Sequence, residues 1–253
     1  MKSIFAYESS QELEVIKPLV GELLAQSEAY KAYLVQNFQL IDPAQAVIWT
    51  RAEQAMTIFA QQPIPAYNNG IRIIMTPDIV EWWTFFEEML SPYPNVPDLV
   101  RNYYQNLPEH HIQQVFFHEL THDCDVFESN YESSRGDLWF EEGMCEYLSR
   151  RYLLSDEAFE QIYQIEAQQV AYFEQYFGKF HVENFNQETY ASQNLAYLMT
   201  FYANAFLVIC QLVEQYESLE KVFERYHAWW QEEAELSLYD RLKQGASTTN
   251  ISE

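Results

Sequence analysis

The stretch His118-Glu119-Leu120-Thr121-His122 decides how the rest of the chain is interpreted. It lies in a segment predicted to be helical, and residues i and i+4 of a helix lie one above the other. His118 and His122 can therefore bind one zinc ion. Glu119 projects beside them, where it can take a proton from a metal-bound water.

The helical context matters because the bare pattern has limited specificity. A random H-E-x-x-H is expected in roughly one to two of a hundred chains with this His and Glu content. Pro108 suits the first position of a helix, and the segment that follows has apolar residues at helical spacing. These apolar residues are Ile112, Val115, Phe116 and Leu120.

A second stretch, Trp139 to Ser149, offers the missing ligand. Catalytic zinc usually has three protein ligands and keeps a fourth position open for water. Glu141 and Glu142 are the candidates in this stretch. They cannot both face the metal, because consecutive residues of a helix point about 100° apart.

Together the two stretches resemble the gluzincin metallopeptidases, in which H-E-x-x-H is followed downstream by W-x-x-E-G-x-x-E-Y. The resemblance implies a zincin-like fold, mainly α (α+β), with a small N-terminal β-sheet over the H-E-x-x-H helix and a helical C-terminal lobe. It also implies that Glu142, the glutamate before Gly143, is the third zinc ligand, with Glu141 as the competitor.

Glu146 follows Glu142 by one helical turn and shares its face. Metal-bound histidines usually donate their other ring N–H to a carboxylate or a carbonyl. In several gluzincins an acidic residue at this position accepts such a hydrogen bond, so Glu146 is expected to accept one from His118. A solvated glutamate on a helix surface is the alternative.

Peptide hydrolysis also needs a donor that stabilises the oxyanion. The stretch Tyr202 to Val208 resembles the Y-x-x-G/A-x-x-[LV] helix that carries the stabilising tyrosine in aminopeptidase-type gluzincins, and this implies that role for Tyr202. A plain packing role is the alternative. The other candidates for the donor are Tyr190, Tyr197, His181 and His227. His110 and His111 are expected at the surface or behind the metal ligands.

The clearest predicted strand is Ile71 to Thr76. The resemblance makes it a candidate for the edge strand that binds extended substrate through its backbone. An interior core strand is the alternative. Exopeptidase gluzincins carry an acidic residue on a Gly-x-Met-Glu-Asn-type strand, and Ile71 to Thr76 contains none, which favours an endopeptidase.

Composition indicates a packed, helical chain. The 253 residues are 48% hydrophobic and include only six Gly, which allows one domain, 1–253. We expect an upper lobe over 1–123, a lower helical lobe over 124–245 and a polar tail at 246–253. The net charge of −24 opposes binding to nucleic acid and to anionic membranes. It favours solubility and cationic peptides, and a solvated acidic surface with no such preference is the alternative.

The N-terminus and the cysteines indicate a cytoplasmic protein. No apolar signal segment follows Met1, and no run is expected to reach transmembrane length. Cys124, Cys145 and Cys210 are too few for a disulfide framework. The first two are expected to be buried thiols, although either is a possible metal ligand.

The remaining pattern predicts helices and one further strand. Asp137 is expected to cap the helix that carries Glu142. Helices are predicted over 8–40, 52–61, 78–90, 98–106, 156–177, 187–216, 218–230 and 233–243, and a short strand over 47–50.

These observations predict a zinc metallopeptidase that hydrolyses peptide or protein substrates, with Glu119 as the general base. Two alternatives stay open. One is a zincin-fold binding or regulatory protein whose zinc is structural. The other is a zinc hydrolase of a non-peptide amide.

Overall fold

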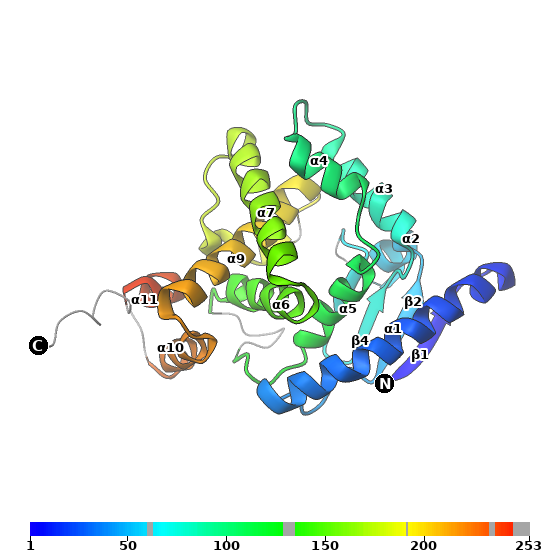
Figure 1. Ribbon diagram of the computed structural model, residues 1–253, viewed down its shortest axis with the longest axis horizontal. Helices are drawn as coiled ribbons and strands as arrows, with labels where there is room; N and C mark the ends of the chain where they lie inside the picture. The colour runs from blue at the N-terminus through cyan, green and yellow to red at the C-terminus, as the bar shows by residue number, and fades with distance from the viewer. Residues whose placement is uncertain (60–62, 129–134, 191, 233–235, 245–253) are drawn as a thin grey trace, which may run out of the picture.

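A computed structural model describes residues 1–59, 63–128, 135–190, 192–232 and 236–244. Helices dominate these residues and surround one small mixed sheet, which confirms the predicted mainly α class. Figure 1 shows the sheet on one side of the molecule and helix α6 (Leu138–Leu153) on the other, with α5 (His111–Thr121) between them. The predicted tail at 246–253 lies outside the described residues.

The sheet has the strand order β1 (Lys2–Ala6), β2 (Ala46–Thr50), β4 (Arg72–Met75), β3 (Ala66–Asn68). β1, β2 and β4 are parallel, whereas β3 runs antiparallel to β4. β2 is buried along its whole length, as expected of a central parallel strand. The sequence predicts β2 and β4 and misses the two edge strands.

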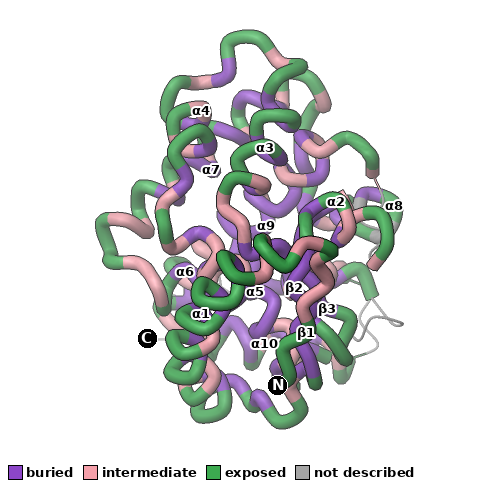
Figure 2. The backbone as a smooth tube through the Cα atoms, turned by 90° about the vertical axis from the view of Figure 1, so that its right-hand side faces the viewer, coloured by how far each residue is buried: buried purple, intermediate pink, exposed green. Residues whose placement is uncertain are grey.

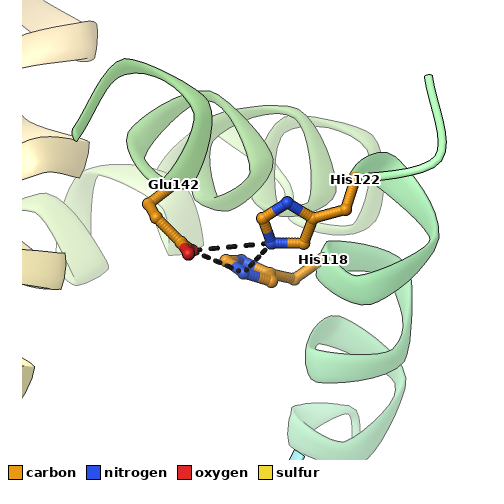
Figure 3. A group of neighbouring side chains, drawn as sticks. All are labelled: His118, His122 and Glu142. Carbon is orange, nitrogen blue, oxygen red and sulfur yellow. Dashed lines mark hydrogen bonds and ion pairs between the residues drawn. The ribbon is translucent and has the colours of Figure 1, made fainter. Parts of the chain in front are cut away.

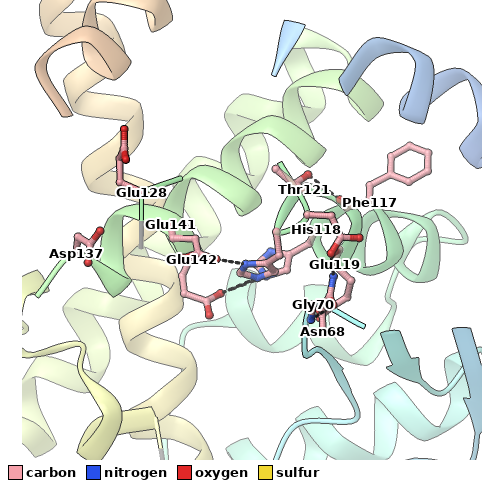
Figure 4. A network of polar contacts seen from close by, with 12 residues as sticks. Asn68, Gly70, Phe117, His118, Glu119, Thr121, Glu128, Asp137, Glu141 and Glu142 are labelled. Carbon is pink, nitrogen blue, oxygen red and sulfur yellow. Dashed lines mark hydrogen bonds and ion pairs between the residues drawn. The ribbon is translucent and has the colours of Figure 1, made fainter. Parts of the chain in front are cut away.

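β4 is the interior strand of the two alternatives given for Ile71 to Thr76, because it lies between β2 and β3. The edge beside α5 is β3 instead. The Asn68 side-chain amide of β3 donates to the Glu119 carbonyl oxygen and to Asp123 Oδ1, at 2.7 Å each. Figure 4 shows Asn68 against Glu119. These bonds fasten the sheet to the helix that carries the H-E-x-x-H motif.

Most helices begin and end close to their predicted positions, because local capping sets their ends. Ser9, Asp78 and Ser155 each accept a hydrogen bond from the backbone of the helix that follows. Gly178, with φ of 80°, ends α7. The further elements are α1 (Ser10–Asn37), α2 (Ala52–Gln54), the π-helical turn η1 (Ala55–Phe59), α3 (Ile79–Leu90), α4 (Asp98–Gln105), α7 (Asp156–Phe177), the 3-10 turn η2 (Val182–Asn184), α8 (Gln187–Tyr190), α9 (Leu195–Tyr216), α10 (Leu219–Gln231) and α11 (Leu238–Gln244).

Several expectations about helix starts are wrong. The helix predicted over 187–216 is two helices, α8 and α9, with residues 192–194 outside both, and α11 begins at Leu238 rather than at 233. α5 begins at His111 rather than at Pro108, since a tight turn closed by the His111 N–H and the Pro108 carbonyl precedes it. Asp137 precedes α6 without capping it through its side chain. Its Oδ2 accepts from the Tyr226 hydroxyl at 3.1 Å and from Trp230 Nε1 at 3.0 Å, so it binds α10 instead.

The expectation that no segment reaches transmembrane length is also wrong. α9 is long and apolar enough to cross a membrane by length and composition, with a mean hydropathy of 1.6. However, 67% of that apolar stretch is buried inside the protein, where α6 and α7 pack against the helix. Figure 2 shows buried residues along α9 in the middle of the molecule. This burial is typical of a core helix.

Candidate metal centre

Two neighbouring helices, α5 and α6, carry the predicted metal ligands. His118 and His122 lie one turn apart at the C-terminal end of α5, and Glu142 lies near the start of α6. Gly143 allows α6 to approach α9 closely, because a Cβ at this position would lie 2.6 Å from the carbonyl oxygen of Ala205. The first turns of α6 are thereby seated between α9 and α5, with Glu142 directed toward the histidines (Figure 3).

The three ligand atoms form a nearly regular triangle (Figure 3). His118 Nε2 lies 3.1 Å from His122 Nε2, and Glu142 Oε2 lies 3.2 Å from the first nitrogen and 3.5 Å from the second. A tetrahedral ion about 2.0–2.1 Å from its ligands separates them by about 3.3 Å. Glu142 Oε2 is buried and accepts no hydrogen bond from any described residue. The triangle therefore fits a metal ion.

A carboxylate lies at the other nitrogen of each histidine. Glu146 Oε1 is 3.3 Å from His118 Nδ1, which is an ion-pair distance, whereas the expected hydrogen bond is not formed because Nδ1 has no hydrogen-bond partner among the described residues. Glu141 Oε1 is 2.7 Å from His122 Nδ1. Carboxylates at both Nδ1 atoms favour a proton there, which leaves both Nε2 lone pairs for a metal.

The two competing glutamates thus have separate places, with Glu142 on the ligand triangle and Glu141 behind His122. The contact between Glu141 and His122 is one that sequence reasoning missed. The helix geometry already indicated it. Glu141 precedes the ligand Glu142 by one position and therefore points about 100° away from it on the helix, beside the ligand triangle rather than into it.

The charges around the triangle favour a cation. Burial opposes protonation of His118, but the Glu146 and Glu142 carboxylates outweigh it and raise the pKa of His118 to about 9. Burial also opposes ionisation of Glu142, yet His122 and His118 hold the pKa of that carboxyl at about 2. The carboxylates therefore stabilise positive charge on the imidazoles. The same carboxylates would also stabilise a divalent cation bound between them.

Glu119 lies beside the triangle, and its side chain is buried. Burial raises the pKa of Glu119 to about 7, although the neighbouring His118 and His122 act against the rise. A carboxyl whose pKa lies near neutral pH can accept a proton and release it again.

A cavity of about 70 Å³ adjoins the centre, with His118, Glu119 and Tyr202 in its wall. One water needs about 10–15 Å³ of such space, so the cavity has room for several waters or for one medium-sized side chain. The Tyr202 ring lies 6.3 Å from the His118 ring, between centroids. The Tyr202 ring also packs against the Phe185 ring at 5.0 Å, so this placement is compatible with both the oxyanion role and the packing role, and decides between neither.

The other candidates for the oxyanion donor lie elsewhere or are not described. The Tyr197 ring packs among Phe177, Phe180 and Phe201. His181 is exposed, and His227 contacts Glu128 on the surface at 3.0 Å. The side chain of Tyr190 lies outside the described part of the structure.

His111 differs from the expectation, because it lies in neither predicted place. It is buried, contacts the rings of Trp82 and Phe86, and lines the cavity. Burial lowers the pKa of His111 to about 3. It is therefore a neutral core residue, whereas the neighbouring His110 is half-buried.

Cys124 and Cys145 are free and buried, as predicted. Burial raises the pKa of Cys145 to about 12, which keeps its thiol protonated at neutral pH. Among the described residues, the group that brings ligand atoms within reach of one ion is His118, His122 and Glu142.

No family profile, curated protein or solved structure matches the chain. What its own residues define is a mainly helical protein with a buried His–His–Glu group that could hold a metal ion.

Proposed function

We propose that the chain is a zinc-dependent metallopeptidase of gluzincin type with a zincin-like fold. It acts in the cytoplasm on peptide or protein substrates, and as an endopeptidase rather than an aminopeptidase. The observation that supports this most is the placement of Glu119. A structural metal site would not need Glu119, which is not one of the three ligands, yet Glu119 lies in the wall of the same cavity as His118.

A zinc ion bound by the triangle would act as a Lewis acid and lower the pKa of a bound water to about 7. Glu119 accepts the proton of the attacking water and passes it to the leaving amine. Tyr202 donates a hydrogen bond to the oxyanion. Glu146 and Glu141 hold the two imidazoles by their Nδ1 atoms.

The test separates metal binding from catalysis. Metal content is measured in the wild type, His122→Ala and Glu119→Gln, and each protein is incubated with a mixed peptide library. We expect one zinc per chain in the wild type and in Glu119→Gln, and loss of zinc in His122→Ala. Internal peptide bonds should be cleaved by the wild type and not by Glu119→Gln, since only the base is lost.

An exposed glutamate provides the matched control. Glu109 lies outside α5, and Glu109→Gln makes the same chemical change away from the triangle. This variant is expected to bind zinc and to cleave peptides like the wild type. Undiminished zinc-dependent cleavage by Glu119→Gln would show that Glu119 is not the base.

A further inference from the structure

Arg150 is a buried cation two helical turns beyond Glu142 on α6. Its Nη2 lies 2.9 Å from Glu146 Oε2 and 2.9 Å from Glu166 Oε1 of α7. Its guanidinium carbon lies 4.3 Å from the centroid of the Phe206 ring of α9. Side chains from three helices thus contact one guanidinium, and Arg150 as a whole is only 7% exposed.

Stability alone does not account for this arrangement. Moving three charged groups out of water is costly, and replacing a buried ion triad by apolar residues is often neutral or stabilising. In the triad of Arg150, Glu146 and Glu166, Glu146 is the member that also contacts a predicted metal ligand. Glu146 binds Arg150 through Oε2, and its Oε1 lies 3.3 Å from His118 Nδ1.

The contacts therefore form a continuous path from Glu166 through Arg150 and Glu146 to His118. The Glu146 carboxylate makes an ion pair at each oxygen, and neither pair has hydrogen-bond geometry. These two ion pairs restrain the rotation of the carboxylate and keep negative charge beside His118 Nδ1. Hydrogen bonding at Nδ1 sets the orientation of an imidazole and the direction of its Nε2 lone pair.

We propose that Arg150, anchored by Glu166, is a positioning residue for the metal centre. It fixes the Glu146 carboxylate, and through it the His118 ring. This inference rests on the metal binding in the proposed function but not on peptide cleavage, so metal affinity tests it separately.

The experiment is a double-mutant cycle on the full chain, read out as zinc affinity by competition with a chromogenic chelator. The four proteins are the wild type, Arg150→Met, Glu146→Gln and the double variant. Arg150→Met should bind zinc roughly tenfold more weakly, in the range found for partners of metal ligands. In the Glu146→Gln background the same change should alter affinity by about twofold or less, because the residue through which Arg150 acts is already changed.

Arg151→Met is the matched control. Arg151 is the next residue of α6, and it pairs with Asp156 at 3.0 Å with 40% of its side chain exposed. Its zinc affinity should equal that of the wild type. Replacing Zn²⁺ with Co²⁺ adds a spectroscopic readout, since a shifted visible spectrum in Arg150→Met reports a changed ligand geometry.

Arg150→Lys keeps the charge and gives a second variant if Arg150→Met fails to fold. A single ammonium reproduces the planar guanidinium poorly, so a smaller loss of zinc affinity is expected. Wild-type affinity in the folded Arg150 variants would overturn the proposal, as would equal losses in both Glu146 backgrounds. Normal zinc binding by the wild type without peptide cleavage would reject the peptidase and leave this inference standing.

Discussion

Glu141 and Glu142 are chemically identical neighbours with different places at the centre. One lies behind His122, 2.7 Å from its Nδ1, and the other lies on the ligand triangle. The difference follows from the rotation of about 100° between consecutive helical residues. Each residue is therefore open to a separate test by the same substitution.

Glu141→Gln should weaken zinc binding roughly tenfold without abolishing it, because the amide oxygen still accepts from His122 Nδ1–H but without the negative charge. Glu142→Gln should reduce binding much further, since it replaces a charged ligand. Competition titrations with a chelator measure both affinities. If the two variants were equally affected, the assignment of separate places would be wrong.

His111 makes the stability of the fold sensitive to acid. Its pKa is about 3 in the folded chain, against 6.5 for an exposed histidine, because burial disfavours the charged ring. Between these values the unfolded chain binds a proton that the folded chain does not. Stability from this residue is thus complete above pH 6.5, and falls by about 1.4 kcal/mol for each pH unit below it.

His111→Phe should remove this dependence. The ring contacts with Trp82 and Phe86 remain possible, and the cavity of about 70 Å³ alongside has room for the larger side chain. Urea unfolding at pH 6.5, 6.0, 5.5 and 5.0 compares the slopes of the two proteins. A variant as acid-sensitive as the wild type over this range would show that His111 is not the group responsible.

At the scale of the elements, the packing of α6 on α9 places Glu142. Gly143→Ala would bring a Cβ to 2.6 Å from the Ala205 carbonyl oxygen and 2.9 Å from Ile209 Cγ1. Because the first of these contacts is with backbone, the helices must separate. A loss of about 1–3 kcal/mol in unfolding free energy is expected, together with weaker zinc binding.

Gly21→Ala provides the control for Gly143→Ala. Gly21 lies within α1, and nothing lies within 4 Å of a Cβ placed there. The same substitution should stabilise the chain by about 0.5–1 kcal/mol, since alanine favours a helix over glycine. Denaturant unfolding measures the unfolding free energy of both variants. An unchanged unfolding free energy in Gly143→Ala would mean that the close approach of α6 and α9 is not needed.

The elements that the sequence predicts are those specified locally. α5 follows from its apolar spacing and α3 from its local pattern, whereas the ligand triangle combines the i, i+4 spacing of His118 and His122 with Glu142, which the resemblance to gluzincins implies. The misses depend on partners distant in sequence. β1 and β3 are short edge strands whose hydrogen bonds come from β2 and β4. The Asp137 side chain accepts hydrogen bonds from Tyr226 and Trp230 of α10 instead of capping α6. The local sequence around Asp137 does not reveal these partners.

At the scale of the whole molecule, the candidate metal centre connects parts of the chain that lie far apart in sequence. α5 is fastened to the sheet through Asn68, and α6 packs on the core helix α9. An ion bound to His118, His122 and Glu142 would cross-link these two layers. The unfolded chain lacks this geometry, so binding of the ion should stabilise the folded state.

Zinc should therefore raise the thermal unfolding temperature of the wild type, and a chelator should lower it. At a free zinc concentration of 100 times Kd, the expected gain is about 2.7 kcal/mol. Differential scanning fluorimetry of the wild type and His122→Ala, with zinc and with chelator, measures the difference. The gain should disappear in His122→Ala, which lacks one of the three ligands.

The net charge of −24 requires a further control, because an acidic surface attracts divalent cations of any kind. Such attraction is screened by salt, whereas binding at the buried triangle is affected much less. Magnesium at the same concentration, and zinc in 0.5 M salt, separate the two effects. A stabilisation that magnesium reproduces, that salt removes or that His122→Ala retains would belong to the surface, and the buried triangle would then not be a metal site.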